Sequence, residues 1–139
     1  MNRRILVLDD DPEATRAAVE VLESHGYSLL TPPNGQAALQ QILSEGPWVV
    51  IAGETLPGGE SGLDFVDRIA EALPALPPPG FIVLQNRSQG GERMEAYRAT
   101  PVGMYLPKPF NRLELLSFVV RLSNAIEARH ESVLYSERR

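Results

Sequence analysis

Several features that carry function in other proteins are missing from this sequence. It has no cysteine, which excludes disulfides and thiolate metal sites. No apolar run approaches the roughly 20 residues that a membrane-spanning helix needs. Lys and Arg form no stripe and the net charge is −5, so we expect no nucleic-acid surface in this chain.

The N-terminal residues, MNRRILVLDDD, place acids within a few residues of a short apolar run. A secretory signal peptide needs a longer apolar region and a small-residue cleavage site, so this segment does not resemble one. Together with the lack of cysteine, this favours a cytoplasmic location. The 139 residues are enough for one domain with a core that needs no cross-links.

Short apolar runs recur five times along the chain and predict five strands. The runs are continuous rather than alternating, which is typical of strands that are buried on both faces of a parallel sheet. The predicted strands cover residues 5–8, 27–30, 48–52, 81–84 and 104–106.

Segments with apolar residues at helical spacing lie between these strands. The side chains of Ser, Asp and Asn are good caps for helix starts, and proline is tolerated at the first helical position. The predicted helices begin after Asp11, Asn34 and Ser61, around residue 92, and near Asn111. We expect the last helix to end near Arg129, so that residues 1–130 form the domain and residues 131–139 a polar tail.

Alternating strands and helices predict an α/β fold with a doubly wound parallel sheet. In such sheets, functional groups gather beyond the carboxyl ends of the strands. An acidic cluster, a lysine and small polar residues should therefore converge there, although they are far apart in sequence. The residues at these ends are Asp9–Asp11, Gly53–Thr55, Gln85–Asn86 and Pro107–Lys108.

Three motifs in these segments resemble the receiver domain of bacterial response regulators. They are residues 6–12 (LVLDDDP), Leu56-Pro57-Gly58 followed by Gly62-Leu63, and residues 105–110 (YLPKPF). The resemblance covers about residues 3–127. It implies a flavodoxin-like five-stranded sheet in the order 2-1-3-4-5 with helices on both faces.

The resemblance also implies roles for individual residues. In the family, an acidic pair after strand one and an aspartate that ends strand three bind Mg²⁺, and that aspartate accepts a phosphoryl group. A Ser or Thr after strand four and a lysine after strand five contact the phosphoryl group. Asp9 and Asp10 match the acidic pair, Lys108 matches the lysine, and Tyr105 matches an aromatic that moves on activation.

Two of the reactive positions depart from the family pattern. The acceptor aspartate falls on Gly53, which has no side chain to carry a phosphoryl group. The Ser/Thr position falls on Gln85, whose amide is larger than a hydroxyl group. The loop from Pro57 to Gly62 is one residue longer than usual. Two changes at neighbouring strand ends indicate that the phosphoryl chemistry is lost.

Alternatives remain open at several positions. Asp9 and Asp10 could hold Mg²⁺, or Lys108 could neutralise them without a metal; we expect no cofactor. Glu54 could serve as a substitute acceptor, but side chains alternate along a strand, so it should point away from the lost aspartate's position. Tyr105 is either a dynamic switch or an interface aromatic.

The last helix carries more apolar surface than one buried face requires. One stripe comprises Leu115, Phe118, Val119, Leu122 and Ile126, and a second comprises Leu113, Leu116 and Val120. A wide apolar arc is typical of a partner surface, although burial under a neighbouring loop would also explain it. In receivers this helix belongs to the dimer and output face. Arg112, Glu114 and Arg121 would then form a polar rim.

We therefore expect a stand-alone receiver without aspartyl phosphorylation and without enzymatic activity. It would act in two-component, or phosphorelay, signalling by contacting a histidine kinase or another response regulator, or by forming a homodimer through the last helix. The alternatives are a receiver that is phosphorylated at a substitute acceptor and an unrelated flavodoxin-like ligand-binding protein. No glycine-rich phosphate loop follows the first strand, which disfavours the last of these.

Overall fold

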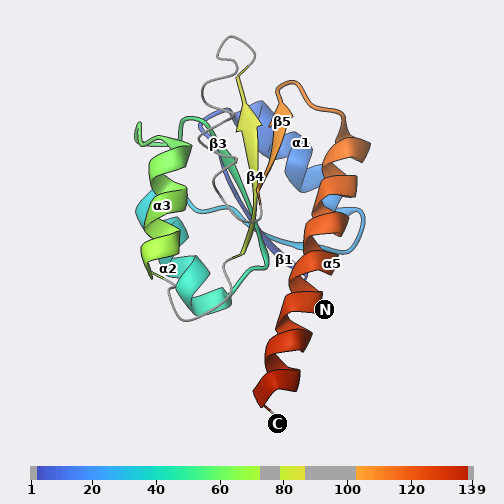
Figure 1. Cartoon of the computed structure of the whole chain (residues 1–139). Coiled ribbons are helices and arrows are strands. Elements are labelled where there is room, and N and C mark those ends of the chain that lie inside the picture. Colours follow the sequence, from blue (N-terminus) through green and yellow to red (C-terminus); the bar gives the residue numbers. More distant parts are fainter. Residues whose placement is uncertain (1–2, 73–78, 87–102, 138–139) are drawn as a thin grey trace.

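Five strands and four helices alternate along the part of the chain that the structure describes, residues 3–72, 79–86 and 103–137 (Figure 1). The structure is a computed structural model. Its elements are β1 (Arg4–Leu8), α1 (Pro12–Glu23), β2 (Ser28–Leu30), α2 (Gly35–Glu45), β3 (Val49–Gly53), α3 (Gly62–Ala72), β4 (Gly80–Gln85), β5 (Gly103–Pro107) and α5 (Arg112–Glu137).

The strands form one parallel sheet in the order β2-β1-β3-β4-β5. This confirms the predicted fold class and strand order. The central strands β3 and β4 are buried along their whole length, which explains why their sequences are continuous apolar runs.

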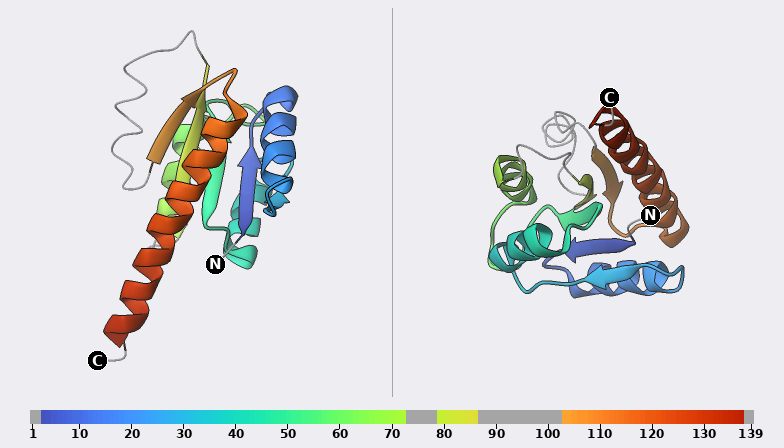
Figure 2. Two further views of the ribbon diagram at one scale, coloured as in Figure 1. Left: turned by 90° about the vertical axis from the view of Figure 1, so that its right-hand side faces the viewer. Right: turned by 90° about the horizontal axis from the view of Figure 1, so that it is seen from below.

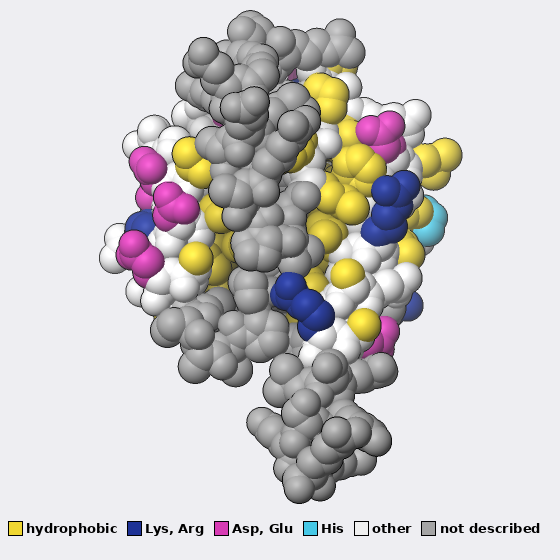
Figure 3. Space-filling model, in the orientation of Figure 1, with side chains coloured by type: hydrophobic (Ala, Val, Ile, Leu, Met, Phe, Trp, Pro, Cys, Tyr) yellow, Lys and Arg dark blue, Asp and Glu magenta, His cyan; other side chains and the backbone are white. Residues whose placement is uncertain are grey.

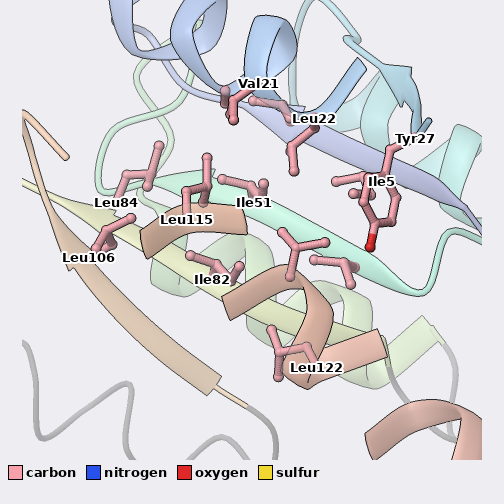
Figure 4. Packing of buried hydrophobic residues seen from close by; sticks show 14 of the residues in the cluster. Ile5, Val21, Leu22, Tyr27, Ile51, Ile82, Leu84, Leu106, Leu115 and Leu122 are labelled. Atoms are coloured by element: carbon pink, nitrogen blue, oxygen red, sulfur yellow. The ribbon is translucent and has the colours of Figure 1, made fainter. Parts of the chain in front are cut away.

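Helices cover both faces of the sheet (Figure 2). Strand side chains alternate between the faces, so the sheet contributes to two separate cores. One core packs β-strand residues such as Ile5 and Ile51 against α1 and α5 (Figure 4). The other packs residues such as Leu6 and Val50 against α2 and α3. The sheet thus forms the middle layer of a three-layer domain.

Side-chain caps start the helices where the sequence predicted them. The Asp11 carboxylate accepts the backbone N–H groups of Glu13 and Ala14 at 3.0 and 3.4 Å, with Pro12 at the first position of α1. Asn34 caps α2 in the same way. Ser61 accepts a backbone N–H in the first turn of α3, and Asn111 accepts two in α5. These local hydrogen bonds satisfy N–H groups that a helix start leaves unpaired.

The last helix is longer than we expected. It continues to Glu137, so the predicted end near Arg129 was wrong, and residues 131–137 belong to the helix rather than to a separate tail. Figure 1 shows its C-terminal part extending well past the sheet. The helix predicted around residues 92–98 lies outside the described residues. Within the described part of the chain, no helix is long and apolar enough to cross a membrane.

The two neighbouring residues Ile42 and Leu43 on α2 test this account of the core. Ile42 is 3% exposed, whereas Leu43 is 55% exposed. We predict that Ile42→Ala lowers the free energy of unfolding by about 2–5 kcal/mol, because it leaves a cavity in the second core. Leu43→Ala should change it by less than about 0.5 kcal/mol. Urea denaturation of both variants measures the difference, and equal losses would contradict the burial described here.

Candidate functional site

The polar residues predicted to meet at one edge of the sheet do so. Gly53 ends β3 and pairs with Leu84, while Gln85 ends β4 and pairs with Pro107. Asp9 directly follows β1, and the Lys108 backbone N–H donates to the Gln85 carbonyl at 2.8 Å. The parallel register therefore brings the ends of β1, β3, β4 and β5 together.

A buried ion pair between Asp9 and Lys108 occupies this edge. The Lys108 Nζ lies 3.2 Å from Asp9 Oδ1 and 3.1 Å from Asp9 Oδ2. The Asp9 side chain is fully buried, and that of Lys108 is 11% exposed. The Asp11 backbone N–H also donates to Asp9 Oδ1, at 3.0 Å. The predicted contact between Lys108 and the acidic residues after β1 is confirmed for Asp9.

The Asp9 carboxylate lies in the space that a side chain at position 53 would fill. A Cβ built on Gly53 would lie 2.6 Å from Asp9 Oδ2, with Cγ and Oδ1 nearer still. Real Cβ contacts are longer than this. Gly53 has no positive φ angle, so its backbone does not require glycine. Instead, the Asp9 carboxylate, which reaches this position from the end of β1, leaves no room for a side chain.

Burial raises the pKa of Asp9 from 3.8 to about 6. The Asp11 N–H and the Lys108 ammonium group both lower this pKa, and the neighbouring Asp10 raises it. Burial has the largest effect because a charged carboxylate loses its hydration when it is enclosed. At neutral pH the carboxylate is ionised, and Lys108 is the cation that faces it.

The other two acids of the cluster behave differently from Asp9. Asp10 is exposed, and its backbone N–H donates to the Thr55 carbonyl at 3.1 Å. Asp11, which we predicted as a helix cap and as a member of the acidic cluster, lies 4.0 Å from the Lys108 Nζ. The prediction that Lys108 faces Asp9 and Asp10 was therefore incomplete, because the second acid near the lysine is Asp11.

The donors at this edge do not match a magnesium site, although the resemblance implies Mg²⁺. Mg²⁺ needs oxygen ligands that are free to coordinate it. The Asp9 carboxylate already contacts an ammonium group, and Gly53 supplies no oxygen from a side chain. Among the described residues, no three Asp, Glu or His side chains are grouped in a way that could hold a metal ion.

Gln85 ends β4, and Tyr105 lies on β5 three residues before Lys108. Gln85 is 6% exposed, and its Nε2 has no hydrogen-bond partner among the described residues. The amide thus fills the position expected for a hydroxyl group with a larger, buried side chain. Tyr105 is partly buried on the edge strand, and its role as a switch or an interface aromatic stays a prediction.

Glu54 does not join the ion pair. Its side chain is 2% exposed, and its Oε1 accepts the Asn86 backbone N–H at 2.6 Å. This agrees with the expectation that Glu54 points away from the position of the lost aspartate. Glu54 joins the end of β3 to the residue that follows β4.

A surface groove of about 820 Å³ adjoins the ion pair, between α1 and the segment after β5. Lys108 forms part of its wall, so the lysine connects the buried Asp9 with the surface. The wall carries acids and bases beside small apolar residues and one aromatic. Its lining comprises Asp11, Glu13, Ala14, Arg16, Ala17, Glu20, Asn86, Lys108, Pro109, Phe110 and Arg112.

The predicted interface residues on α5 divide into different groups. Leu113 and Val120 are 70% and 41% exposed, but Leu116 is partly buried and packs against the first core. Arg112 pairs with Glu20 of α1 at 3.1 Å. Arg121 lies over the Phe118 ring at 5.7 Å, on another side of the helix. The single polar rim that we expected was therefore wrong, because helical geometry separates Arg112 from Arg121.

Sequence reasoning missed the direction of the Asp9 side chain. The motif placed Asp9 beside the position expected for the acceptor aspartate, but not in its space. The combination of a glycine at the end of β3 with an acid after β1 is the signal that could have indicated it.

Removing the cation should leave a buried charge without a partner. We predict that Lys108→Met lowers the free energy of unfolding by about 3–5 kcal/mol at neutral pH. Arg112→Met is the matched control, since it breaks the exposed pair with Glu20 and should cost less than about 1 kcal/mol. Denaturant unfolding compares the two. Similar losses would show that Lys108 is simply solvated.

The raised pKa of Asp9 predicts a pH dependence of stability. Because the folded protein binds this proton more tightly than the unfolded chain, the contribution is fully present below about pH 4 and is lost as the pH rises through about 6. Asp9→Asn removes this term. The stability of the wild type relative to Asp9→Asn should therefore fall between about pH 4 and pH 7, as measured by urea unfolding. A relative stability that increases with pH would contradict the assignment.

This chain matches the response regulator receiver domain family over residues 5–120. The transcriptional regulatory protein KdpE of Mycobacterium tuberculosis is 33% identical over 122 residues, which cover 88% of this chain and 50% of that protein. The nitrogen assimilation regulatory protein NtrX of Azorhizobium caulinodans is 29% identical over 94% of this chain and 28% of its own length.

Solved structures agree with this assignment. A crystal structure of a putative response regulator from Chloroflexus aurantiacus is 26% identical, with a TM-score of 0.73, over 88% of this chain and 98% of that one. NtrX from Brucella abortus, at 21% identity and a TM-score of 0.83, shares the fold over 99% of this chain and 30% of its own. The chain spans about half the length of KdpE and 28% of the length of NtrX. The expected stand-alone role therefore stays a prediction. The unrelated ligand-binding alternative is wrong: this chain belongs to the receiver domain family of two-component response regulators.

Proposed function

We propose that this receiver domain signals through protein contacts, without phosphorylation of an aspartate and without catalytic activity of its own. The observation that carries the proposal is the Asp9 carboxylate in the space beside Gly53. The position that needs a nucleophile has no side chain, and a carboxylate held by Lys108 fills its place. A site in this state has no free nucleophile to receive a phosphoryl group.

The same arrangement supports the proposal that the domain works without Mg²⁺. Phosphoryl transfer relies on cations that neutralise the developing charge. Here Lys108 already neutralises a carboxylate of the protein itself. A metal ion would have to displace the ammonium group from Asp9, against the attraction of a buried ion pair.

A substitute acceptor is the rival proposal. Asp9 is the carboxylate beside the missing side chain, but its own side chain has no exposure to a phosphoryl donor. Glu54 is buried and bound to the Asn86 N–H. Asp10 and Asp11 are more accessible, yet Asp11 also serves as the cap of α1. The geometry therefore favours loss of the reaction over its transfer to another residue.

Receiver domains interact with kinases or with other regulators. For this chain we propose the same classes of partner, a histidine kinase or another response regulator. The groove between α1 and the segment after β5 supports such a contact because both charged and apolar side chains line it. A domain with a permanently occupied site would present this surface in one state, rather than switching it by phosphorylation.

Intact mass spectrometry after incubation with acetyl phosphate and Mg²⁺ tests this proposal. We expect no gain of one phosphoryl group in the wild type, whereas a receiver that has the strand-three aspartate should gain one under the same conditions. A stoichiometric gain by the wild type, mapped to any Asp or Glu, would overturn the proposal.

Gly53→Asp is the informative variant in the same assay. We expect it to remain unmodified as well, because the new side chain meets the Asp9 carboxylate and Gln85 still replaces the family's hydroxyl group. Efficient modification of Gly53→Asp would show that the rest of the site is intact. The absence of side chain 53 would then be the whole defect, and the Asp9–Lys108 pair would not block the reaction.

A further inference from the structure

Two residues in the wall of the groove donate hydrogen bonds to carboxylates of the chain itself. Asn86 and Lys108 both line the groove, and they directly follow β4 and β5. The Asn86 backbone N–H donates to Glu54 Oε1 at 2.6 Å. The Lys108 ammonium group contacts the two oxygens of Asp9 at 3.2 and 3.1 Å. Both donors could serve a bound anion, but an internal carboxylate already occupies each of them.

Glu54 places a carboxylate in a buried position. On the face of the molecule that Figure 3 shows, acidic side chains stand at the surface, where water solvates them. Glu54 is instead 2% exposed. A buried carboxylate loses its hydration, and an apolar side chain would fill the same volume without that loss. The charge-assisted hydrogen bond from the Asn86 N–H offsets part of this loss, so the contact is what distinguishes an acid from an apolar residue here.

The two carboxylates reach the groove wall from neighbouring strands. Asp9 directly follows β1 and Glu54 directly follows β3, and these two strands are paired in the sheet. Asp9 contacts the residue after β5, and Glu54 contacts the residue after β4. The ends of β4 and β5 are themselves joined, because the Lys108 N–H donates to the Gln85 carbonyl at 2.8 Å. The two carboxylates thus hold both strand ends that contribute to the groove wall.

A further donor at this edge of the sheet has no acceptor. The Gln85 Nε2 is buried and makes no hydrogen bond within the described residues. A buried donor without a partner is costly and marks a place where an acceptor could bind. If the internal carboxylates were absent, an anion at this edge could use this amide together with the Asn86 N–H and the Lys108 ammonium group.

We propose that Asp9 and Glu54 act as a built-in pair of anions that closes a latent anion site and fixes the wall of the groove. Glu54 is a positioning residue, which holds the segment after β4 as Asp9 holds the segment after β5. These side chains replace an external anion, so the contact surface forms without a ligand. The inference rests on the proposed function, since it treats the groove as the contact surface.

Amide hydrogen exchange, measured by NMR with inorganic phosphate as the probe, tests the role of Glu54. In Glu54→Ala the Asn86 N–H should exchange about 10- to 100-fold faster than in the wild type, because it loses a charged acceptor. Phosphate added at constant ionic strength should slow this exchange again by about tenfold. The Ala37 N–H, which donates to Asn34 Oδ1 at 2.9 Å, is the internal control and should not respond.

Two results of this measurement would overturn the proposal. One is an Asn86 N–H that exchanges equally fast in Glu54→Ala and in the wild type. The other is faster exchange that phosphate does not slow, because Glu54 would then be an ordinary structural acceptor and not a substitute for an anion.

Thermal unfolding of Asp9→Ala combined with Glu54→Ala tests the latent site as a whole. Phosphate at constant ionic strength should raise the Tm of this variant by about 3 °C or more, and that of the wild type by less than about 1 °C. Glu60→Ala is the matched control, since it frees the Arg68 guanidinium group from a 2.7 Å ion pair elsewhere. Phosphate also stabilises proteins without specific binding, so equal responses of all three proteins would refute the latent site. If the double variant does not fold, the exchange of Glu54→Ala decides.

The phosphorylation assay is separate from both measurements. A wild type that gains a phosphoryl group overturns the proposed function, whatever phosphate does to the Asn86 N–H. A Glu54→Ala variant that does not respond to phosphate overturns only this inference and leaves the proposed function as it stands.

Discussion

The organisation of the candidate site depends on the ion pair between Asp9 and Lys108. These residues follow the first and the last strand of the sheet and are 99 positions apart. The pair crosses the end of β3, so it can form only where β3 contributes no side chain of its own. Because the Asp9 side chain is fully buried, loss of Lys108 would leave a buried charge without a partner and would lower the free energy of unfolding. The glycine at position 53 and the lysine at position 108 are thus parts of one arrangement.

Under the proposed function, this arrangement lets a receiver fold persist without phosphoryl transfer. Carboxylates that gather at a sheet edge repel one another unless a cation neutralises them. In this chain the protein supplies that cation, and Gln85 fills the neighbouring position with a buried amide. In the proposed function, the domain presents one stable surface. Its α1 groove and its exposed α5 face are then the features available for contact with other proteins.

The sequence predicted the fold well because its signals are local and consistent. Apolar runs such as Ile5–Leu8 and the caps Asp11 and Asn34 depend on neighbours in the chain, and the structure confirms them. The predicted α5 was too short. The residues after Arg129 are polar, but polarity alone does not end a helix. The direction of the Asp9 side chain was not predictable in this way. It depends on empty space beside Gly53, which only the packing of three strands creates.

A double-mutant cycle between Gly53→Ala and Asp9→Ala tests the central claim most directly. The added methyl group is small, and the strand backbone at position 53 accepts it, so any cost must come from its neighbours. If the Asp9 carboxylate fills this space, Gly53→Ala should destabilise the wild type but not the Asp9→Ala protein. The coupling free energy should then be about 1–3 kcal/mol, measured by urea unfolding. Equal effects of Gly53→Ala in the two backgrounds would show that the carboxylate lies elsewhere.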